Sequence, residues 1–446
     1  MPIAKSLDLL DDLLKRARKA GAEAADAVFV EGAALSVAER LGKPEKLERA
    51  EGRDLGLRVL MGKRQAIVSS TDFSPRALDE LAARAIAMAR AVPEDPFCGI
   101  ADPADLAKAT PALDLCDPDE PSTETLMARL REAEEVARAV PGVTNSEGAE
   151  AGWSRSHIAL AASNGFRNGY EISSSSVSVA VLAGEGTGME RDYDFTSAIY
   201  GGDLESPATI GRRAGEKAVK RLNPRKVETS KAPVVFDPRV SNTLVGHLAG
   251  AINGAGIARG VSFLKDKMGQ RLFPAGIEIV DDPHIRRGLR SKPFDGEGLA
   301  NRKLALVADG VLKTWVLDLR SARQLSLKST GHAARGTSSP PGPSTTNLYL
   351  AAGKQSPKQL MADIASGFYC TELIGFGVNN VTGDYSRGAS GFWIENGEIA
   401  YPVSEITIAG NLNDMFQHLA AADDLEFRYG TNAPSVRVDG MTVAGR

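Results

Sequence analysis

The pattern of apolar residues along the chain starts with a helical period. Four apolar side chains in the first twenty residues recur every three or four positions, and a glycine follows at position 21. This spacing predicts an amphipathic helix that ends at the glycine and packs its apolar face on another element. The four apolar residues are Leu7, Leu10, Leu14 and Ala17.

Strands and a second helix are predicted next. The segments DAVFVEG and LGLRVLMGKRQAIVSSTD are typical of strands, with a hairpin at Gly62-Lys63. The segment SPRALDELAARAIAMARAV then begins with Ser74 as a helix cap and Pro75 at the first helical position. The order is therefore helix, strands, helix.

The same order recurs further along the chain. STETLMARLREAEEVARAV predicts a helix, SHIALAASNGF and SSSSVSVAVLAG predict strands around an Asn164-Gly165 turn, and Ser206-Pro207 starts another helix. We interpret residues 1–95 and 120–222 as two copies of one helix–strands–helix module. The stretch 93–121, rich in proline and aspartate, is the predicted linker between them.

A different region, residues 234–446, follows a second predicted linker at 223–233. It contains hairpin signals at Asp309-Gly310 and Asn396-Gly397. The overall fold class is therefore predicted as α+β, with two duplicated N-terminal modules and a strand-rich C-terminal domain with helices. The helices expected in this domain span 238–257, 356–366 and 410–421.

One segment of the C-terminal region has no apolar period. Residues 328–346 lie in KSTGHAARGTSSPPGPSTTN, which is packed with glycine, proline, serine and threonine. We expect an exposed, mobile loop, and the sequence leaves open whether it moves as a lid.

Composition narrows the class of protein. A chain of 446 residues is too long for one ordinary hydrophobic core, so more than one domain is expected. Hydrophobic residues make up 43% of the chain and charged residues 25%, which is typical of a soluble globular protein. The formal net charge of −4 gives no basic excess, so direct binding of nucleic acid is not expected. No apolar run approaches the roughly 20 residues that span a bilayer. We expect a cytoplasmic protein without a signal peptide or a membrane partner.

The cysteines argue against a structural metal site. Cys98, Cys116 and Cys370 are odd in number and show no CxxC or Cys/His clustering. We expect three reduced thiols.

The helix TLVGHLAGAINGAGI, residues 243–257, is the first candidate site. His247 stands where a metallopeptidase motif would begin, but Leu248 follows it, and Ala251 and Ile252 occupy the positions of a second ligand. None of these three side chains accepts a proton or binds a metal ion. A packed helix with one satisfied histidine is the favoured interpretation. Glycines at 246, 250 and 254 predict a close backbone approach on one face.

Three acidic residues and one histidine are further candidate site residues. Asp281, Asp295 and Glu297 are candidate metal ligands, but turn formation before Pro283 explains the first of them more simply. His332 is the one histidine in the predicted loop 328–346, a kind of loop that often carries function. The simplest interpretation is that its side chain is exposed to solvent. No nucleophile elbow, phosphate-binding loop or dinucleotide fingerprint occurs.

The stretch NNVTGDYSRGASGFWIENGEIAYPVSEITIAGNL, residues 379–412, is the second candidate site. Asp384 and Arg387 are placed to pair within a turn, and three glycines would leave backbone groups accessible to an extended peptide by strand addition. A structural turn and hairpin explains the stretch equally well. The three glycines are Gly383, Gly388 and Gly391.

Long strings of the sequence resemble a known family. GVSFLKDKMGQ, SKPFDGEGLANRKLALVADGVLKTWVLD, ARQLSLKSTGHAARG and TELIGFGVNNVTGDYSRGASGFWIENGEIAYPVSEITIAGNLNDMF are similar to the TldD/PmbA family, and within it to the PmbA type, also called the TldE type. The resemblance runs along nearly the whole chain and is densest from residue 234 onward.

The resemblance implies one half of a cytosolic zinc metallopeptidase. In that family a TldD-like and a PmbA-like chain form a heterodimer that degrades or processes short unfolded peptides. The TldD type carries its zinc on an HExxxH helix and a later cysteine. Laid on that motif, His247 falls on the first histidine, Leu248 on the glutamate and Ile252 on the second histidine, and no cysteine follows Cys370. The resemblance therefore implies the non-catalytic partner, with no cofactor of its own and zinc in the TldD-like chain.

Two alternatives stay open at this point. The first is a stand-alone metallopeptidase with unrecognised ligands, for which Asp281, Asp295 and Glu297 are the candidates. The second is a non-enzymatic adaptor or modulator of the action of DNA gyrase toxins, present as a homodimer. Neither the peptide substrates nor the existence of a TldD-like partner follows from the sequence.

Overall fold

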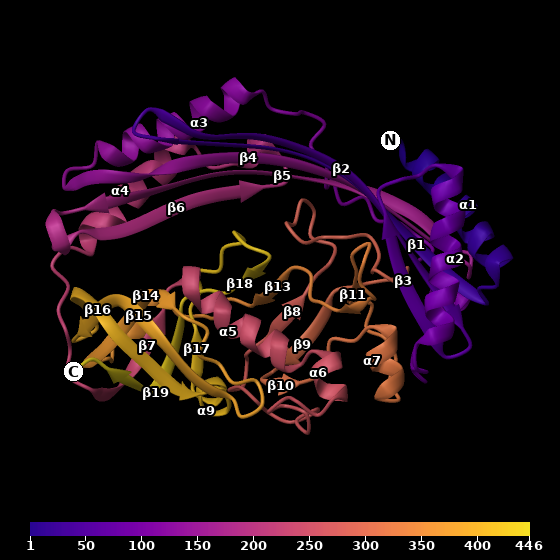
Figure 1. Ribbon diagram of the computed structural model, residues 1–446. Coiled ribbons are helices and arrows are strands. Elements are labelled where there is room, and N and C mark those ends of the chain that lie inside the picture. Colours follow the sequence, from indigo (N-terminus) through magenta and orange to yellow (C-terminus); the bar gives the residue numbers. More distant parts are fainter.

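A computed structural model describes all residues, 1–446, and shows an arched sheet above a C-terminal body (Figure 1). The arch is a six-stranded antiparallel sheet in the order β3-β2-β1-β4-β5-β6, in which β1 of the first module pairs with β4 of the second. Its strands are β1 (Ala24–Arg40), β2 (Lys43–Met61), β3 (Arg64–Ser70), β4 (Val143–Ala162), β5 (Arg167–Ala183) and β6 (Glu190–Ala198).

Two pairs of helices cover the convex face of the arch, one pair at each end (Figure 1). Each pair buries its apolar stripe against the sheet, and each of the two separate cores also takes in one strand of the other module, β4 under α1 and α2 and β1 under α3 and α4. The predicted helix–strands–helix order and its duplication are confirmed, as are the serine caps with proline at the first helical position. The helices are α1 (Ile3–Ala20), α2 (Pro75–Ala91), α3 (Thr123–Arg138) and α4 (Pro207–Lys220).

The C-terminal body contains a ring of strands. Strands β16, β15, β14, β7 and β19 pair in that order, β16 also pairs with β19, and β17 extends the sheet from β19. The Asn396-Gly397 turn is confirmed, with both residues at positive φ as a type I′ hairpin requires. The strands are β7 (Ser230–Phe236), β14 (Ser366–Ile374), β15 (Asp384–Glu395), β16 (Glu398–Asn411), β17 (Leu419–Ala421) and β19 (Val436–Ala444).

A second, five-stranded sheet shares one core with this ring. It has the order β10-β9-β8-β13-β18, and the predicted Asp309-Gly310 turn joins β9 to β10. Its strands are β8 (Ile279–Asp281), β9 (Leu304–Ala308), β10 (Val311–Leu312), β13 (Leu348–Leu350) and β18 (Thr431–Asn432), and β11 (Ala333–Ala334) pairs separately with β12 (Gly342–Pro343).

The helices of the body are shorter than the sequence predicts. The helix expected over 238–257 breaks at Ile252, and Asn253 caps a new helix with its side chain. The break lets Gly254 lie so close to Val316 that a Cβ would be 2.8 Å from its carbonyl oxygen. Gly246 and Gly250 meet nothing, so the close approach occurs at one of the three glycines. The helices are α5 (Pro238–Ala251), α6 (Gly254–Ala258), α7 (Leu319–Gln324), α8 (Pro357–Met361) and α9 (Leu412–Gln417).

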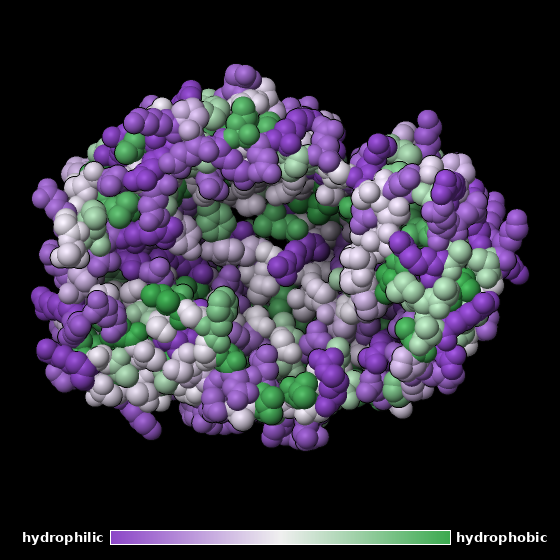
Figure 2. All heavy atoms as spheres, in the orientation of Figure 1, coloured by the Kyte–Doolittle hydropathy of each residue, from purple (hydrophilic) through white to green (hydrophobic).

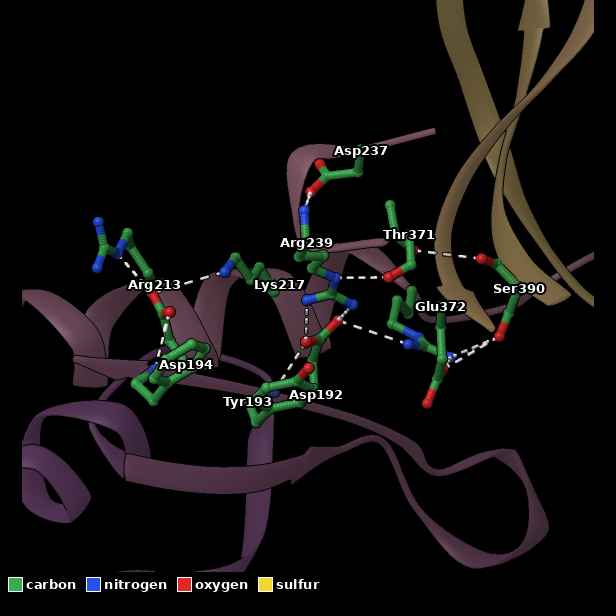
Figure 3. Close-up of polar contacts among 12 residues, drawn as sticks. Asp192, Tyr193, Asp194, Arg213, Lys217, Asp237, Arg239, Thr371, Glu372 and Ser390 are labelled. Atoms are coloured by element: carbon green, nitrogen blue, oxygen red, sulfur yellow. Dashed lines mark hydrogen bonds and ion pairs between the residues drawn. The ribbon is translucent and has the colours of Figure 1, made fainter. Parts of the chain in front are cut away.

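Buried ion pairs join the arch to the body at both ends. At one end Asp26 of β1 binds Arg58 and, from the body, Arg335; all three side chains are at most 5% exposed. At the other end Asp192 of β6 binds Arg239 of α5 (Figure 3). Between these two contacts the surface is hollowed (Figure 2). Because both ends are fixed, the height of the arch above the body is fixed too.

The segment 328–346 is docked under the arch rather than exposed. His332 and Thr346 are each 1% exposed, and the Thr337 hydroxyl donates to Asp54 of β2. The expectation of an exposed loop is therefore wrong for much of the segment. Composition pointed to solvent because the partners of these residues lie more than 50 positions away in the sequence.

Replacing Gly56 with alanine is expected to weaken this docking. A Cβ at Gly56 would lie 2.0 Å from the carbonyl oxygen of Thr337, so the loop must move away from β2. We expect the free energy of unfolding to fall by about 1–3 kcal/mol, as in other overpacked sites. Gly52→Ala on the same strand meets nothing within 4 Å and is the matched control. Equal stability of the two variants in urea unfolding would contradict the docked loop.

No helix is both long and apolar enough to cross a bilayer.

Candidate functional site

The first candidate site surrounds His247 on α5. Its ring lies edge-on to Tyr385 of β15, with 5.9 Å between ring centroids, and its Nε2 has no hydrogen-bond partner. The hydroxyl of Tyr385 and the Nε of Arg387 are also buried without partners. Burial and, to a smaller extent, the nearby charge of Arg387 lower the pKa of His247 to about 4. The imidazole is therefore neutral at neutral pH.

The residues at this site do not fit a zinc ion. Leu248 is 1% exposed and Ile252 is fully buried, and both belong to the core of the body. Cys370 of β14 is buried, and burial strongly raises the pKa of its thiol, so it stays protonated. One imidazole next to a guanidinium is not a zinc site, since zinc binding needs three or four converging ligands. No three His, Cys, Asp or Glu side chains lie close enough anywhere in the chain to hold a metal.

The low pKa of His247 predicts a loss of stability in acid. In the unfolded chain the imidazole has its ordinary pKa of 6.5, whereas in the folded chain its pKa is about 4. Between these values the unfolded state holds more protons, so stability falls as the pH falls through this window. We expect a loss of about 2 kcal/mol, measured by urea unfolding at pH 7 and pH 4.5. His247→Gln, which does not titrate, is expected to lose correspondingly less.

The second candidate site is an interior strand. Residues 384–395 form β15, which is paired on one side with β14 and on the other with β16. Its backbone groups are used in these ladders, so the hypothesis of strand addition here is wrong. Asp384 does not pair with Arg387; its carboxylate accepts from Thr382 Oγ1 at 2.6 Å and Asn411 Nδ2 at 3.1 Å. These two hydrogen bonds lower the pKa of Asp384.

The glycines of this stretch have structural roles. Gly383 has a φ of +83° in the turn before β15. A Cβ at Gly388 would lie 3.3 Å from the Cβ of Ile374, and one at Gly391 would lie 2.0 Å from the Tyr369 carbonyl oxygen. Close packing against β14 thus explains the last two, and a role of the stretch in lining a substrate groove stays a prediction.

The acidic residues weighed as metal ligands are buried and satisfied. Asp281 accepts from the Thr346 backbone amide at 2.6 Å and lies 3.1 Å from Nε2 of His332. His332 is therefore buried in an Asp–His contact, and the expectation of an exposed histidine is wrong. Asp295 accepts three backbone N–H groups, those of Glu297, Leu299 and Ala333. These contacts organise turns and leave few lone pairs for a cation.

Glu297 is held in its protonated form. Burial, helped by the charge of Asp295, raises the pKa of Glu297 to about 8. Its Oε2 accepts the backbone N–H of Leu319 at 2.8 Å. A carboxylic acid that is neutral at pH 7 is a poor ligand for a divalent cation.

Sequence reasoning missed the concave face of the arch. Even-numbered residues of β1 point to the body, because Asp26 on that face binds Arg335. A cavity of about 570 Å³ lies against this face, and small side chains dominate its lining. The alternation of small and larger residues in GWSRSHI and SSSSVSV was the available signal. The small lining residues are Gly32, Ala34, Ala50, Gly52, Ser154 and Ser156, and Ser154 is paired with Ser174 on β5.

This geometry has counterparts among known proteins. Three family models match the chain: PmbA/TldA metallopeptidase domain 1 at residues 25–89, the central domain at 116–222 and the C-terminal domain at 229–445. Metalloprotease PmbA of Escherichia coli O157:H7 is 40% identical over 92% of this chain and 90% of its own. A PmbA homolog of Haemophilus influenzae is 36% identical over 96% of this chain and 94% of its own.

Solved structures share the fold. TldE from Thermococcus kodakarensis superposes with a TM-score of 0.88 at 21% identity, covering 98% of this chain and 100% of that one. A suggested modulator of DNA gyrase from Bacteroides thetaiotaomicron superposes with a TM-score of 0.90 at 25% identity, covering 98% of both chains.

Proposed function

The chain belongs to the PmbA/TldD metallopeptidase family, and from this premise we propose that it is the non-catalytic, TldE-type subunit of a heterodimeric peptidase. The zinc ion and the general base would belong to a TldD-type partner. The substrates would be short unfolded peptides, and the complex would act in the cytoplasm.

One observation carries this proposal. The positions that would complete an HExxxH motif after His247 are Leu248 and Ile252, and both side chains lie inside the apolar core. A core position cannot present a carboxylate or an imidazole to substrate without unpacking its neighbours. This burial supports a chain that does not build the HExxxH zinc site itself and obtains hydrolytic chemistry from another subunit.

We assign the concave face of the arch to the substrate. Its small residues leave room for an extended chain, and the hydroxyls of Ser154, Ser156 and Ser174 offer hydrogen bonds to peptide groups. We call this concave face the substrate wall. The buried ion pairs at both ends of the arch hold it in place. In the complex this wall would position the peptide and exclude bulk water, while zinc in the partner would activate the attacking water.

The decisive experiment compares the chain alone with the chain mixed with a TldD-type subunit. We expect the lone chain to contain less than stoichiometric zinc and to leave an unfolded test peptide intact, and the mixture to cleave it. Stoichiometric zinc and cleavage by the lone chain would instead support the stand-alone enzyme. Unchanged cleavage by the TldD-type chain when this chain is omitted would support the non-enzymatic adaptor.

A bulky residue on the concave face is expected to block the substrate. Ser154→Trp places an indole in the cavity of about 570 Å³, and we expect kcat/KM of the reconstituted complex to fall about tenfold or more through lost binding. Glu48→Trp, at an exposed position of β2 outside the cavity lining, is the control. Equal cleavage by complexes with either variant would show that the substrate does not bind on this face.

A further inference from the structure

A second cavity lies mainly on the face of the arch opposite the proposed substrate wall, and the two cavities share lining residues, among them Gly52 and Arg53. Its volume is about 980 Å³, and nine of its twelve lining residues are not hydrophobic. The lining includes Glu31 and His157, which lie on the face of Phe29 and Ala159, the face that packs under α1 and α2. The cavity therefore borders the start of α1, where Met1 lines it and Ser6 contacts His157.

Four charged or polar side chains form one row across this cavity. Arg53 of β2 is opposite Glu31 of β1, Glu31 is opposite His157 of β4, and His157 is opposite Glu171 of β5. Directly opposed residues of antiparallel strands point to the same side, so all four face the cavity. The row is defined by these four residues.

His157 has one satisfied and one unsatisfied ring nitrogen. Its side chain is 5% exposed, its Nε2 lies 2.7 Å from Ser6 Oγ, and its Nδ1 has no hydrogen-bond partner. The Ser6 hydroxyl donates to the Ile3 carbonyl at 2.9 Å, which leaves its lone pairs for an N–H at Nε2. In this tautomer Nδ1 is an acceptor without a donor.

Glu171 is a second acceptor with no donor from the protein, and its side chain is 46% exposed. Its Oε1 is 3.6 Å from Nδ1 of His157, and its carboxylate takes part in no hydrogen bond. The neighbouring carboxylate, Glu31, already accepts from the amino group of Met1 and lies 3.8 Å from Arg53. Two adjacent acceptors at the wall of an open cavity are complemented by a cationic donor with more than one N–H.

We propose that this row binds the ammonium group of a ligand, between His157 Nδ1 and the carboxylate of Glu171. One N–H donates to the imidazole nitrogen and a second to the carboxylate, which also supplies the opposite charge. The group has two sources, the free α-amine of a peptide or an alkylamine such as a lysine side chain. The site lies on the other face of the sheet from the substrate wall and does not depend on the proposed peptidase function.

The test uses the full chain and three probes in titration calorimetry. The probes are tetra-alanine with a free amino terminus, N-acetyl tetra-alanine and 1,5-diaminopentane. Binding of the free but not the acetylated peptide identifies an α-amine site, and preference for the diamine identifies an alkylamine site. Glu171→Gln is expected to weaken binding at least tenfold, whereas Glu48→Gln, outside the cavity, leaves it unchanged. Two results would overturn the proposal. One is that no probe binds at 10 mM, roughly the dissociation constant of the weakest such contact. The other is that the Glu171→Gln and Glu48→Gln variants bind the probes equally.

A second readout examines the imidazole directly. The chain has five histidines, so nitrogen NMR of the ring resonances can be assigned by substituting His157 with glutamine. We expect Nδ1 to carry no proton in the free protein, with Nε2 as the N–H that faces Ser6, and a shift of the Nδ1 resonance on adding the amine that binds. A proton on Nδ1 in the free protein would mean that Nδ1 itself donates toward Glu171, and the ammonium site would not exist.

Discussion

Arg239→Met is expected to lower the free energy of unfolding by about 3 kcal/mol, because it leaves a buried carboxylate partly unpaired. Arg239 donates to both oxygens of Asp192, at 2.7 and 3.2 Å, and the two side chains are 11% and 3% exposed. Figure 3 shows the guanidinium between Asp192 and the strand that carries Thr371. Arg221 remains 3.5 Å from the same carboxylate, which keeps the loss at the lower end of the range for broken buried pairs.

The measurement is urea unfolding followed by tryptophan fluorescence. Trp153 reports on the arch, and Trp315 and Trp393 report on the body. Arg76→Met removes an ion pair to Glu80 in which both side chains are more than half exposed, and a loss below about 1 kcal/mol is expected for this control. A loss of the same size in both variants would mean that the buried pair does not hold the arch to the body.

Restoring the lost motif is expected to unfold the chain rather than to activate it. In the double variant Leu248→Glu, Ile252→His, a carboxylate and an imidazole replace two side chains that are at most 1% exposed. Burying an unpaired ionisable group in an apolar core costs several kcal/mol, and we expect a loss of about 4 kcal/mol or more. Zinc content and peptide cleavage are expected to stay at the level of the unmodified chain.

The control for this variant keeps the polarity of the core. Leu248→Met, Ile252→Val changes shape but buries no charge, and a loss of about 1–2 kcal/mol is expected. Stability comes from thermal and urea unfolding, and zinc from elemental analysis of the purified protein. A stable double variant that binds one zinc ion would contradict the assignment of these positions to the core and would weaken the division of labour between subunits.

The sequence predicted the starts of helices well, because neighbouring residues alone determine where a helix begins. The Ser74, Ser206 and Ser356 caps, each followed by proline, start helices at the predicted residues. A cap needs only the next three residues to make its hydrogen bond. The predicted helices 356–366 and 410–421 are too long. In the structure α8 ends at Met361 and α9 at Gln417, and the chain then continues into strands β14 and β17.

Long-range contacts decided the features that the sequence left open or placed wrongly. His332 was expected in solvent, yet its partner Asp281 lies 51 residues earlier in the chain. For residues 379–412 the sequence left strand addition and a structural hairpin equally open, and strands on both sides of β15 use its backbone groups. The row of His157 and Glu171 was not predicted at all, since it depends on the register of β1, β2, β4 and β5.

The sequence by itself determined the duplicated modules, the turns, the family and the degenerate motif after His247. These follow from hydrophobic period, backbone preference and residue identity, which are properties of neighbouring positions. Only the tertiary structure decided that Leu248 and Ile252 are core, that the two modules form one arch and that hollows lie on both of its faces. The burial of a side chain and the pairing of a strand depend on segments distant in sequence, because the apolar area that drives folding is shared between them.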